Sequence, residues 1–251
     1  MPRPASPAVL AALRARIARL EGDARAAGVL PFGIPALDRH LPGGGLARGA
    51  LHEVAGGGGD TAGAAAALFA AGIAARISGP VLWCVTRADL FAPGLAQAGL
   101  AAARVIHVEA GDNRAVLACM EEGLHHGGPG AVVGEVARLP MVASRRLHLA
   151  AREGGTLCIA LRRWHRQAEA HDFGRPTAAM TRWRVTALPS APLPVPGVGR
   201  ARWRVELVRA RAGECLDLEL EACDGTGHLA LPAAVADGAA AAAGGQRRAA
   251  G

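Results

Sequence analysis

Short apolar runs alternate with longer helical patterns through the middle of the chain. The strand candidates are 51–55, 80–86, 104–109, 130–136 and 156–161. Apolar residues recur at helical spacing between them, at about 62–78, 92–102, 112–126 and 142–153. Strands that are apolar throughout and separated by helices are typical of a mostly parallel sheet covered on both faces. The pattern therefore predicts an α/β fold with helices flanking a central sheet.

An amphipathic helix is predicted ahead of this core, over residues 7–27. Ser6 and Pro7 suit its start, and Gly28 suits its end. Its apolar stripe has helical spacing and consists of Val9, Leu10, Leu13, Ile17 and Leu20. Two interpretations stay open: the helix packs on its own domain, or it docks onto another subunit or partner. In the second case the contact residues would be Leu13, Ile17 and Leu20.

The pattern changes to period two after residue 181. Three apolar residues, Trp203, Val205 and Leu207, alternate with Arg202, Arg204 and Glu206. A turn signal at 211–214 leads into a second alternating run at 216–221. This arrangement predicts an antiparallel hairpin whose arginines face carboxylates. Core packing is the favoured role of both tryptophans, Trp183 and Trp203. The alternative is a second partner-docking surface formed by Arg202, Trp203 and Arg204.

Four segments are expected along the chain. Residues 1–28 hold the N-terminal helix and residues 29–180 the α/β core. Residues 181–236 form a β-rich extension, and 237–251 form a tail of Ala, Gly and Arg that we expect to be disordered.

The chain contains no lysine, so all 28 basic residues are arginines, against 21 acids and a net charge of +7. This bias is typical of a GC-rich genome. The charge still permits contact with nucleic acid or an acidic protein. The five cysteines are scattered without a C-x-x-C pair, which supports neither a disulfide framework nor a metal site. Without a signal peptide or an uncharged apolar span, we expect a cytoplasmic protein that has no contact with a membrane.

A glycine-rich loop at 56–63 joins the first core strand to an alanine-rich helix, where a nucleotide-binding protein would carry G-x-x-x-x-G-K-[ST]. The lysine of that motif contacts the β- and γ-phosphates, and its hydroxyl binds magnesium. Ala62 stands at the lysine position and Gly63 at the hydroxyl position. Asp60 would compete with phosphate for the amides at the start of the helix, which Asp60 or Thr61 is expected to cap. The altered loop comprises Gly56, Gly59, Asp60, Thr61, Ala62 and Gly63.

A second candidate site lies between residues 162 and 182, where arginines alternate with aromatic residues. Such a segment can bind single-stranded DNA through phosphate neutralisation and base stacking. A solvated basic loop with no ligand is the alternative, and the pattern favours it. The residues concerned are Arg162, Arg163, Trp164, His165, Arg166, His171, Phe173, Arg175 and Arg182.

Four segments together carry a resemblance to a known family. They read LPFGIPALD at 30–38, AVVGEV at 131–136, ASRRL at 143–147 and TRWRV at 181–185. They are similar to the ImuA family, which are RecA-like accessory proteins of damage-induced mutagenesis. The likeness covers about residues 7–232, and the run from 33 to 49 also resembles RecA itself. The family is more distantly similar to SulA, an inhibitor of cell division. The resemblance implies a RecA-like core with a degenerate phosphate loop.

The RecA pattern also shows which further groups have changed. Gly134 stands where the magnesium-positioning aspartate belongs, because Glu135 would point to the other face of its strand. The run 86–89 replaces the segment with the water-activating glutamate, and Arg162 and Arg163 replace the polar sensor of the γ-phosphate. Charge neutralisation and water activation are the work of these groups in phosphoryl transfer. The resemblance therefore implies a protein without ATPase activity, cofactor or metal.

The function implied is that of a non-catalytic adaptor in translesion DNA synthesis. Its expected partners are an ImuB-type protein related to Y-family polymerases and an error-prone replicative-type polymerase. RecA, weak contact with single-stranded DNA and a homo-oligomer are further candidates. The alternative is a SulA-like inhibitor that binds the division GTPase. The chain length, with its N-terminal helix and C-terminal β segment, favours the ImuA reading.

Overall fold

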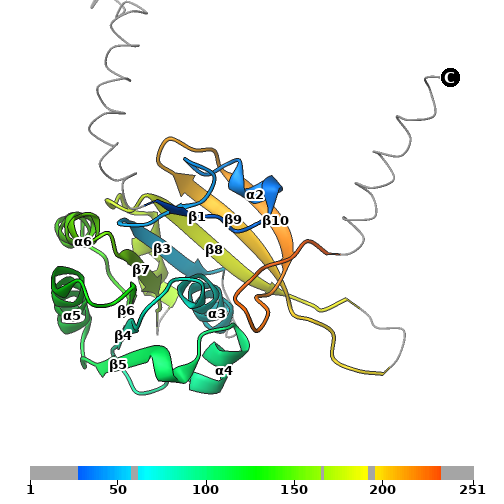
Figure 1. The fold of residues 1–251 in the computed structure, drawn as a ribbon, viewed down its shortest axis with the longest axis horizontal. Helices are drawn as coiled ribbons and strands as arrows, with labels where there is room; N and C mark the ends of the chain where they lie inside the picture. Colours follow the sequence, from blue (N-terminus) through cyan, green and yellow to red (C-terminus); the bar gives the residue numbers. More distant parts are fainter. Residues whose placement is uncertain (1–27, 58–61, 165–166, 192–195, 233–251) are drawn as a thin grey trace, which may run out of the picture.

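The computed structural model describes residues 28–57, 62–164, 167–191 and 196–232. A central sheet lies between two layers of helices in this part of the chain (Figure 1). The predicted N-terminal helix and the predicted tail lie outside it, and so does most of the glycine loop.

The main sheet of the described residues has eight strands in the order β10-β9-β8-β3-β7-β6-β4-β5. The six adjacent strands from β8 to β5 in this order are parallel to one another. Strand β9 runs antiparallel to both β8 and β10. The bounds are β3 (Leu51–Gly56), β4 (Val81–Val85), β5 (Val105–Glu109), β6 (Ala131–Val136), β7 (Leu157–Arg162), β8 (Thr181–Leu188), β9 (Arg202–Ala210) and β10 (Leu216–Glu221). Two short strands, β1 (Val29–Leu30) and β2 (Leu46–Ala47), form a separate antiparallel pair.

Helices cover both faces of the parallel part, as Figure 1 shows. One face packs against α3 (Ala62–Ala75) and α4 (Ala92–Gln97), and the other against α5 (Asn113–His126) and α6 (Met141–Gly154). A short helix, α2 (Pro35–Asp38), and two 3-10 turns, η1 (Ala102–Arg104) and η2 (Gln167–Gly174), complete the described elements. The five predicted core strands are all present, and four of them are buried on both faces, which explains why they read as continuous apolar runs.

The core on the α3 face is built around aromatic rings from distant parts of the chain. The ring of Phe69 lies 5.7 Å from that of Trp183 and 6.4 Å from that of Trp203, and Phe32 lies 5.5 Å from Trp183. Aromatic pairs at these separations add to the stabilisation from buried apolar area. Both tryptophans therefore have the core role that the sequence favours.

The predicted hairpin is confirmed and continues the main sheet. Trp203 of β9 lies opposite Leu220 of β10, and both face the core. On the other face Arg204 pairs with Asp217, and Arg202 lies 2.5 Å from Glu219. Because β8 is hydrogen-bonded to β3 in parallel, the C-terminal strands extend the core sheet and do not form a sheet of their own.

Two helices end earlier than their periodicity predicts. The helix expected at 92–102 stops at Gln97, because Gly99 adopts a left-handed φ of 91° and lies close to the 224–229 turn. A Cβ on Gly99 would lie 2.5 Å from the amide nitrogen of Gly227. The helix expected at 62–78 stops at Ala75, where the Arg104 guanidinium donates to the Ala75 carbonyl at 2.7 Å. Tertiary contacts therefore set both boundaries.

No helix among the described residues has the length and apolar character needed to cross a membrane.

Candidate functional site

The described end of the glycine loop is tied to β8. Gly57 donates its amide to the Val185 carbonyl at 3.0 Å, and a Cβ at Gly57 would lie 1.7 Å from the Thr186 hydroxyl. Only glycine fits so close to β8. Of the loop residues singled out by the sequence, Gly56 ends β3 and Ala62 begins α3, with Gly63 exposed in its first turn. Gly59, Asp60 and Thr61 lie outside the described residues, so their capping role stays a prediction.

A charge cluster lies where β4, β6 and β7 end. The guanidinium of Arg163, directly after β7, contacts both carboxylate oxygens of Asp89, at 2.8 and 2.7 Å. It also donates to Glu135 Oε2 at 2.7 Å, and the indole of Trp83 donates to Glu135 Oε1 at 3.1 Å. Burial alone would lower the pKa of Arg163, but the hydrogen bonds that it donates to Glu135 and Asp89 raise it. One guanidinium thus neutralises a carboxylate from the loop after β4 and one from β6.

The alternation expected along β6 is confirmed. A Cβ on Gly134 would lie 2.1 Å from the sulfur of Met120 on α5, whereas Glu135 points to the face covered by α3. The side chain of Glu135, and not the Gly134 position, therefore lies on the side of the helix that follows the glycine loop. The expectation that Gly134 stands where the magnesium-positioning aspartate belongs is wrong for this structure. Its two oxygens are both engaged, by Trp83 and Arg163, in the described structure.

A second, buried cluster joins β3, β7 and β8 on the α5–α6 face. Arg182 Nε lies 2.6 Å from Glu53 Oε2, and Arg162 Nη1 lies 3.8 Å from Glu53 Oε1. Arg162 also pairs with Asp172 of η2, whose carboxylate accepts the Leu139 amide at 3.1 Å. Burial raises the pKa of Asp172, but these hydrogen bonds outweigh it, and the net pKa is lowered. The charges balance, as buried charges must.

The segment from 162 to 182 folds over this cluster. Phe173 is buried, the Arg182 guanidinium lies 5.1 Å from its ring centroid, and the Trp164 indole donates to the Ala137 carbonyl at 2.9 Å. Arg162 is completely buried, so its prediction as a contact residue for DNA or a partner is wrong for this structure. Burying that charge against two carboxylates costs less than leaving them unpaired.

Of the other cations in that segment, two are paired with carboxylates and one is exposed. Arg163 is engaged by two carboxylates, and Arg182 is buried against Glu53. Arg175 is 68% exposed at its side chain and keeps the predicted accessibility, although it lies 3.8 Å from Asp172. Arg166 and His165 lie outside the described residues. Most of the basic character that suggested DNA binding is therefore neutralised within the protein.

The C-terminal candidate for partner docking is also changed by the fold. Trp203 is 3% exposed, so it cannot contact a partner without unfolding the hairpin, and this part of the prediction is wrong. Arg202 and Arg204 lie on the polar face and are paired with Glu219 and Asp217. Leu13, Ile17 and Leu20 lie outside the described residues and remain predictions.

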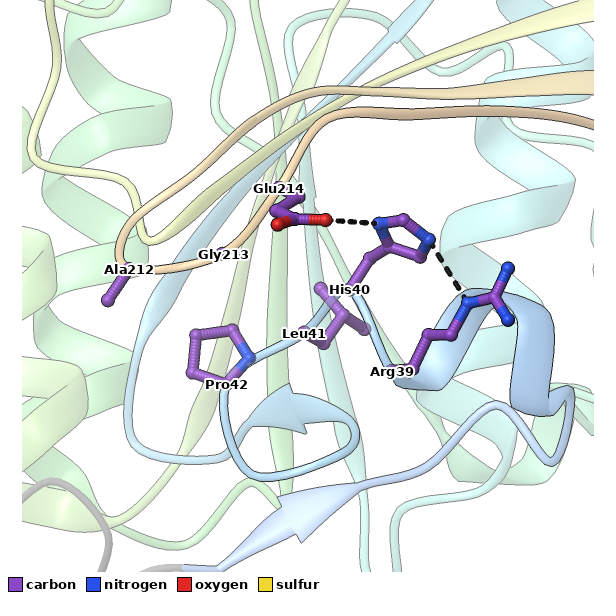
Figure 2. A pocket seen from close by; sticks show the side chains of 7 residues that line it. All are labelled: Arg39, His40, Leu41, Pro42, Ala212, Gly213 and Glu214. Carbon is purple, nitrogen blue, oxygen red and sulfur yellow. Dashed lines mark hydrogen bonds and ion pairs between the residues drawn. The ribbon is translucent and has the colours of Figure 1, made fainter.

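A shallow pocket of about 340 Å³ lies at the opposite end of the sheet from Arg163, beside the β9–β10 turn. Figure 2 shows His40 between Arg39 and Glu214; His40 Nδ1 lies 3.6 Å from the Glu214 carboxylate. The Glu214 amide donates to the His40 carbonyl at 3.3 Å, which fixes the turn to the loop after α2. The pocket contains no residue that the sequence singled out for a site, and its contacts join the hairpin to the core.

Burial suppresses the reactivity of two of the cysteines. Burial raises the pKa of Cys84 and that of Cys223 to about 12, so both thiols stay protonated. Among the described residues, no three or more His, Cys, Asp or Glu side chains are placed to hold a metal ion.

Sequence reasoning missed the acids that neutralise the arginines. Glu53, Asp89, Glu135 and Asp172 come from four separate segments, and only the fold brings each beside Arg162 or Arg163. One signal was available for Glu53, because a carboxylate inside an apolar strand needs a buried partner. Its partner could not be named from spacing.

Comparisons with known proteins agree on a fold and a family. No family model matches the chain. Protein ImuA from Caulobacter vibrioides, in two strains, is 42% identical over 196 residues, which is 74% of this chain and 80% of that protein. The crystal structure of the RadB recombinase is similar with a TM-score of 0.55 and 17% identity, covering 81% of this chain and 99% of that one.

The structural likeness confirms the predicted RecA-like architecture, with a mostly parallel sheet flanked by helices and antiparallel C-terminal strands. At 17% identity it shows the fold alone. The identity to the two ImuA proteins extends over most of both chains. The chain therefore belongs to the ImuA family.

Proposed function

We propose that this protein is a non-catalytic, RecA-like adaptor in damage-induced mutagenesis. It supports error-prone translesion DNA synthesis by binding an ImuB-type protein and an error-prone polymerase. Membership of the ImuA family supports a role in damage-induced mutagenesis. The adaptor acts in the cytoplasm, where these partners meet DNA.

One observation carries the non-catalytic part of the proposal. The two carboxylates at the ends of β4 and β6, Asp89 and Glu135, are bound by the guanidinium of Arg163. In a RecA-like ATPase such carboxylates would position magnesium or activate water. A carboxylate whose oxygens already accept charged hydrogen bonds is a poor metal ligand and a poor base. The arginine therefore supplies an internal positive charge at the edge of the sheet where a nucleotide would bring magnesium.

The loop chemistry supports the same conclusion. Phosphoryl transfer depends on positioning and on charge neutralisation, which a lysine and a magnesium-bound hydroxyl provide. This chain has Ala62 and Gly63 at those positions and no lysine anywhere. The RecA-like domain would then act by binding other proteins through its surface.

We expect no ATP hydrolysis above background, with or without single-stranded DNA. The measurement is phosphate release by pure protein in magnesium and ATP. Gly63→Asp is the matched loop control, because a side chain at Gly63 meets no atom within 4 Å and should leave the fold intact. Hydrolysis by the natural protein that this variant lacks would contradict the proposal.

We expect deletion of the gene to reduce damage-induced mutation towards the uninduced frequency, since an adaptor is needed to assemble the polymerase. Mutation to rifampicin resistance after ultraviolet light measures this, with survival counted in parallel. A tagged protein recovered from damaged cells should carry the ImuB-type protein and the polymerase. Recovery of the division GTPase without either polymerase-related protein would instead indicate a SulA-like inhibitor.

A further inference from the structure

The outward face of α6 carries two exposed aliphatic side chains. Val142 is 69% exposed and Leu149 is 54% exposed. They lie seven residues apart, which places them on one face of the helix, two turns from each other. Among the large hydrophobic residues exposed in the described part of the chain, no other two share a helix or strand. Single exposed aliphatic residues are ordinary, but a spaced pair on one helix is a feature of docking surfaces.

The rest of α6 is fixed firmly to the molecule. Leu147 and Ala151 are buried in the core beneath it. The Ser144 hydroxyl accepts the Ala178 amide at 3.0 Å, and His148 Nδ1 accepts the Leu51 amide at 3.4 Å. The outward face is therefore held in place before any partner arrives, which lowers the entropy cost of binding.

A cation lies between the two aliphatic residues of this pair. Arg145 is exposed between Val142 and Leu149 on the helix, and no carboxylate of the described residues pairs with it. On the neighbouring α5, Glu121 is engaged by Arg146 at 2.8 Å.

Two histidines of α5 and α6 extend this description. His125 lies 3.9 Å from both Glu121 and Glu153, so the second acid of the surface also has a neighbour. His148 points inward and accepts the Leu51 amide, so the exposed cation between the two aliphatic residues is Arg145.

We propose that the outward face of α6, formed by Val142, Arg145 and Leu149, docks an acidic amphipathic helix of a protein partner. The aliphatic pair would bury its side chains against the apolar stripe of that helix, and Arg145 would meet a carboxylate. A phosphate backbone would use the arginine but gain nothing from the aliphatic pair, so the surface fits a protein better than DNA. This inference rests on the adaptor function and names the surface it uses.

The test uses the full chain and measures its affinity for two probes, the ImuB-type protein and the error-prone polymerase of the same organism. The double variant V142D/L149D and the single variant R145E should each weaken binding to one probe by at least about tenfold. The effect of R145E should shrink in high salt, because screening weakens the charge pair it removes. Val198, which is 97% exposed elsewhere, provides the control V198D, and its affinity should not change.

The outcomes separate this inference from the adaptor function. If the natural protein binds neither probe, the adaptor function itself fails. If it binds and the α6 variants bind equally well, only the α6 inference is overturned.

Loss of single-stranded oligonucleotide binding without loss of protein binding would overturn the α6 inference in favour of nucleic acid. A smaller mass of the variants in sedimentation would overturn it in favour of a second copy of the chain. Altered hydrogen exchange of residues 7–27 in the isolated variant would assign the face to the protein's own N-terminal segment. Unchanged circular dichroism and melting temperature show that the variants fold.

Discussion

Replacement of Arg162 by methionine is expected to lower the free energy of unfolding by about 3–5 kcal/mol, the range for breaking a buried ion pair from one side. Arg162 is buried between Glu53 and Asp172, and no water reaches its side chain. Methionine fills a similar volume but leaves both carboxylates short of their cation. Glu53 keeps Arg182, whereas Asp172 keeps only the Leu139 amide and the more distant, exposed Arg175. The η2 segment, which Asp172 anchors, should loosen first.

Urea denaturation followed by circular dichroism measures this loss. Arg175→Met is the matched control, since Arg175 belongs to the same segment but is mostly exposed, and its effect should stay within about 0.5 kcal/mol. Asp172→Asn combined with Arg162→Met should cost less than the sum of the two single changes, because the second change removes the charge that the first leaves unpaired. A loss below about 1 kcal/mol for Arg162→Met would mean that the cluster is not paired as described.

Acidification from pH 6.5 to pH 4 is expected to remove about 3 kcal/mol of stability through His52 alone, at about 1.4 kcal/mol per pKa unit. Burial lowers the pKa of His52 from 6.5 to about 4. The unfolded chain takes up this proton near pH 6.5 and the folded protein only near pH 4. The unfolded state therefore binds more protons in that window, and stability falls as the pH falls. The contribution is fully present above pH 6.5.

The hydrogen bonds of His52 show why the neutral ring is preferred. Its Nε2 donates to the Ala47 carbonyl at 2.8 Å, and its Nδ1 accepts from the Thr181 hydroxyl at 2.7 Å. Thr181 in turn accepts the Trp183 indole N–H at 2.7 Å. Protonation of Nδ1 would turn this acceptor into a donor and leave the Thr181 proton without its partner. The network links β2, β3 and β8, so its loss should be felt across the sheet.

Unfolding free energies at several pH values, for the natural protein and for His52→Asn, isolate this residue. The variant should be less stable at pH 7 but should lose less between pH 6.5 and 4. His148, whose pKa is also lowered, titrates in the same direction and is present in both proteins, so the difference between the two slopes belongs to His52. Equal slopes would show that His52 is not buried as a neutral ring.

The predicted and observed folds agree where the pattern depends on near neighbours in the chain. The five core strands were visible because a strand covered on both faces must be apolar at every position. The hairpin of β9 and β10 was visible because one face is apolar and the other charged. The ends of α3 and α4 were predicted too late, since Arg104 and Gly99 set them from outside the helical repeat.

The candidate site, too, has features that the sequence predicts and features that it does not predict. The altered phosphate loop could be read from the chain because a loop motif is contiguous, and the family could be read from four short segments. The sequence could not predict which arginines between 162 and 182 are buried and paired, because most of their carboxylate partners lie far away in the chain.

The sequence by itself determined the α/β class, the order of the core elements, the hairpin and the ImuA resemblance. These follow from periodicity and from contiguous motifs, which act over a few residues. Only the tertiary structure decided which charges are free. Glu53 and Arg182 are 129 residues apart in the chain, and Arg163 and Asp89 are 74 apart, yet each pair is in direct contact. Side-chain periodicity is local, whereas the pairing of buried charges depends on which strands become neighbours in the sheet. That order paired Arg162, Arg163 and Arg182 with carboxylates, and it left Val142 and Leu149 of α6 exposed.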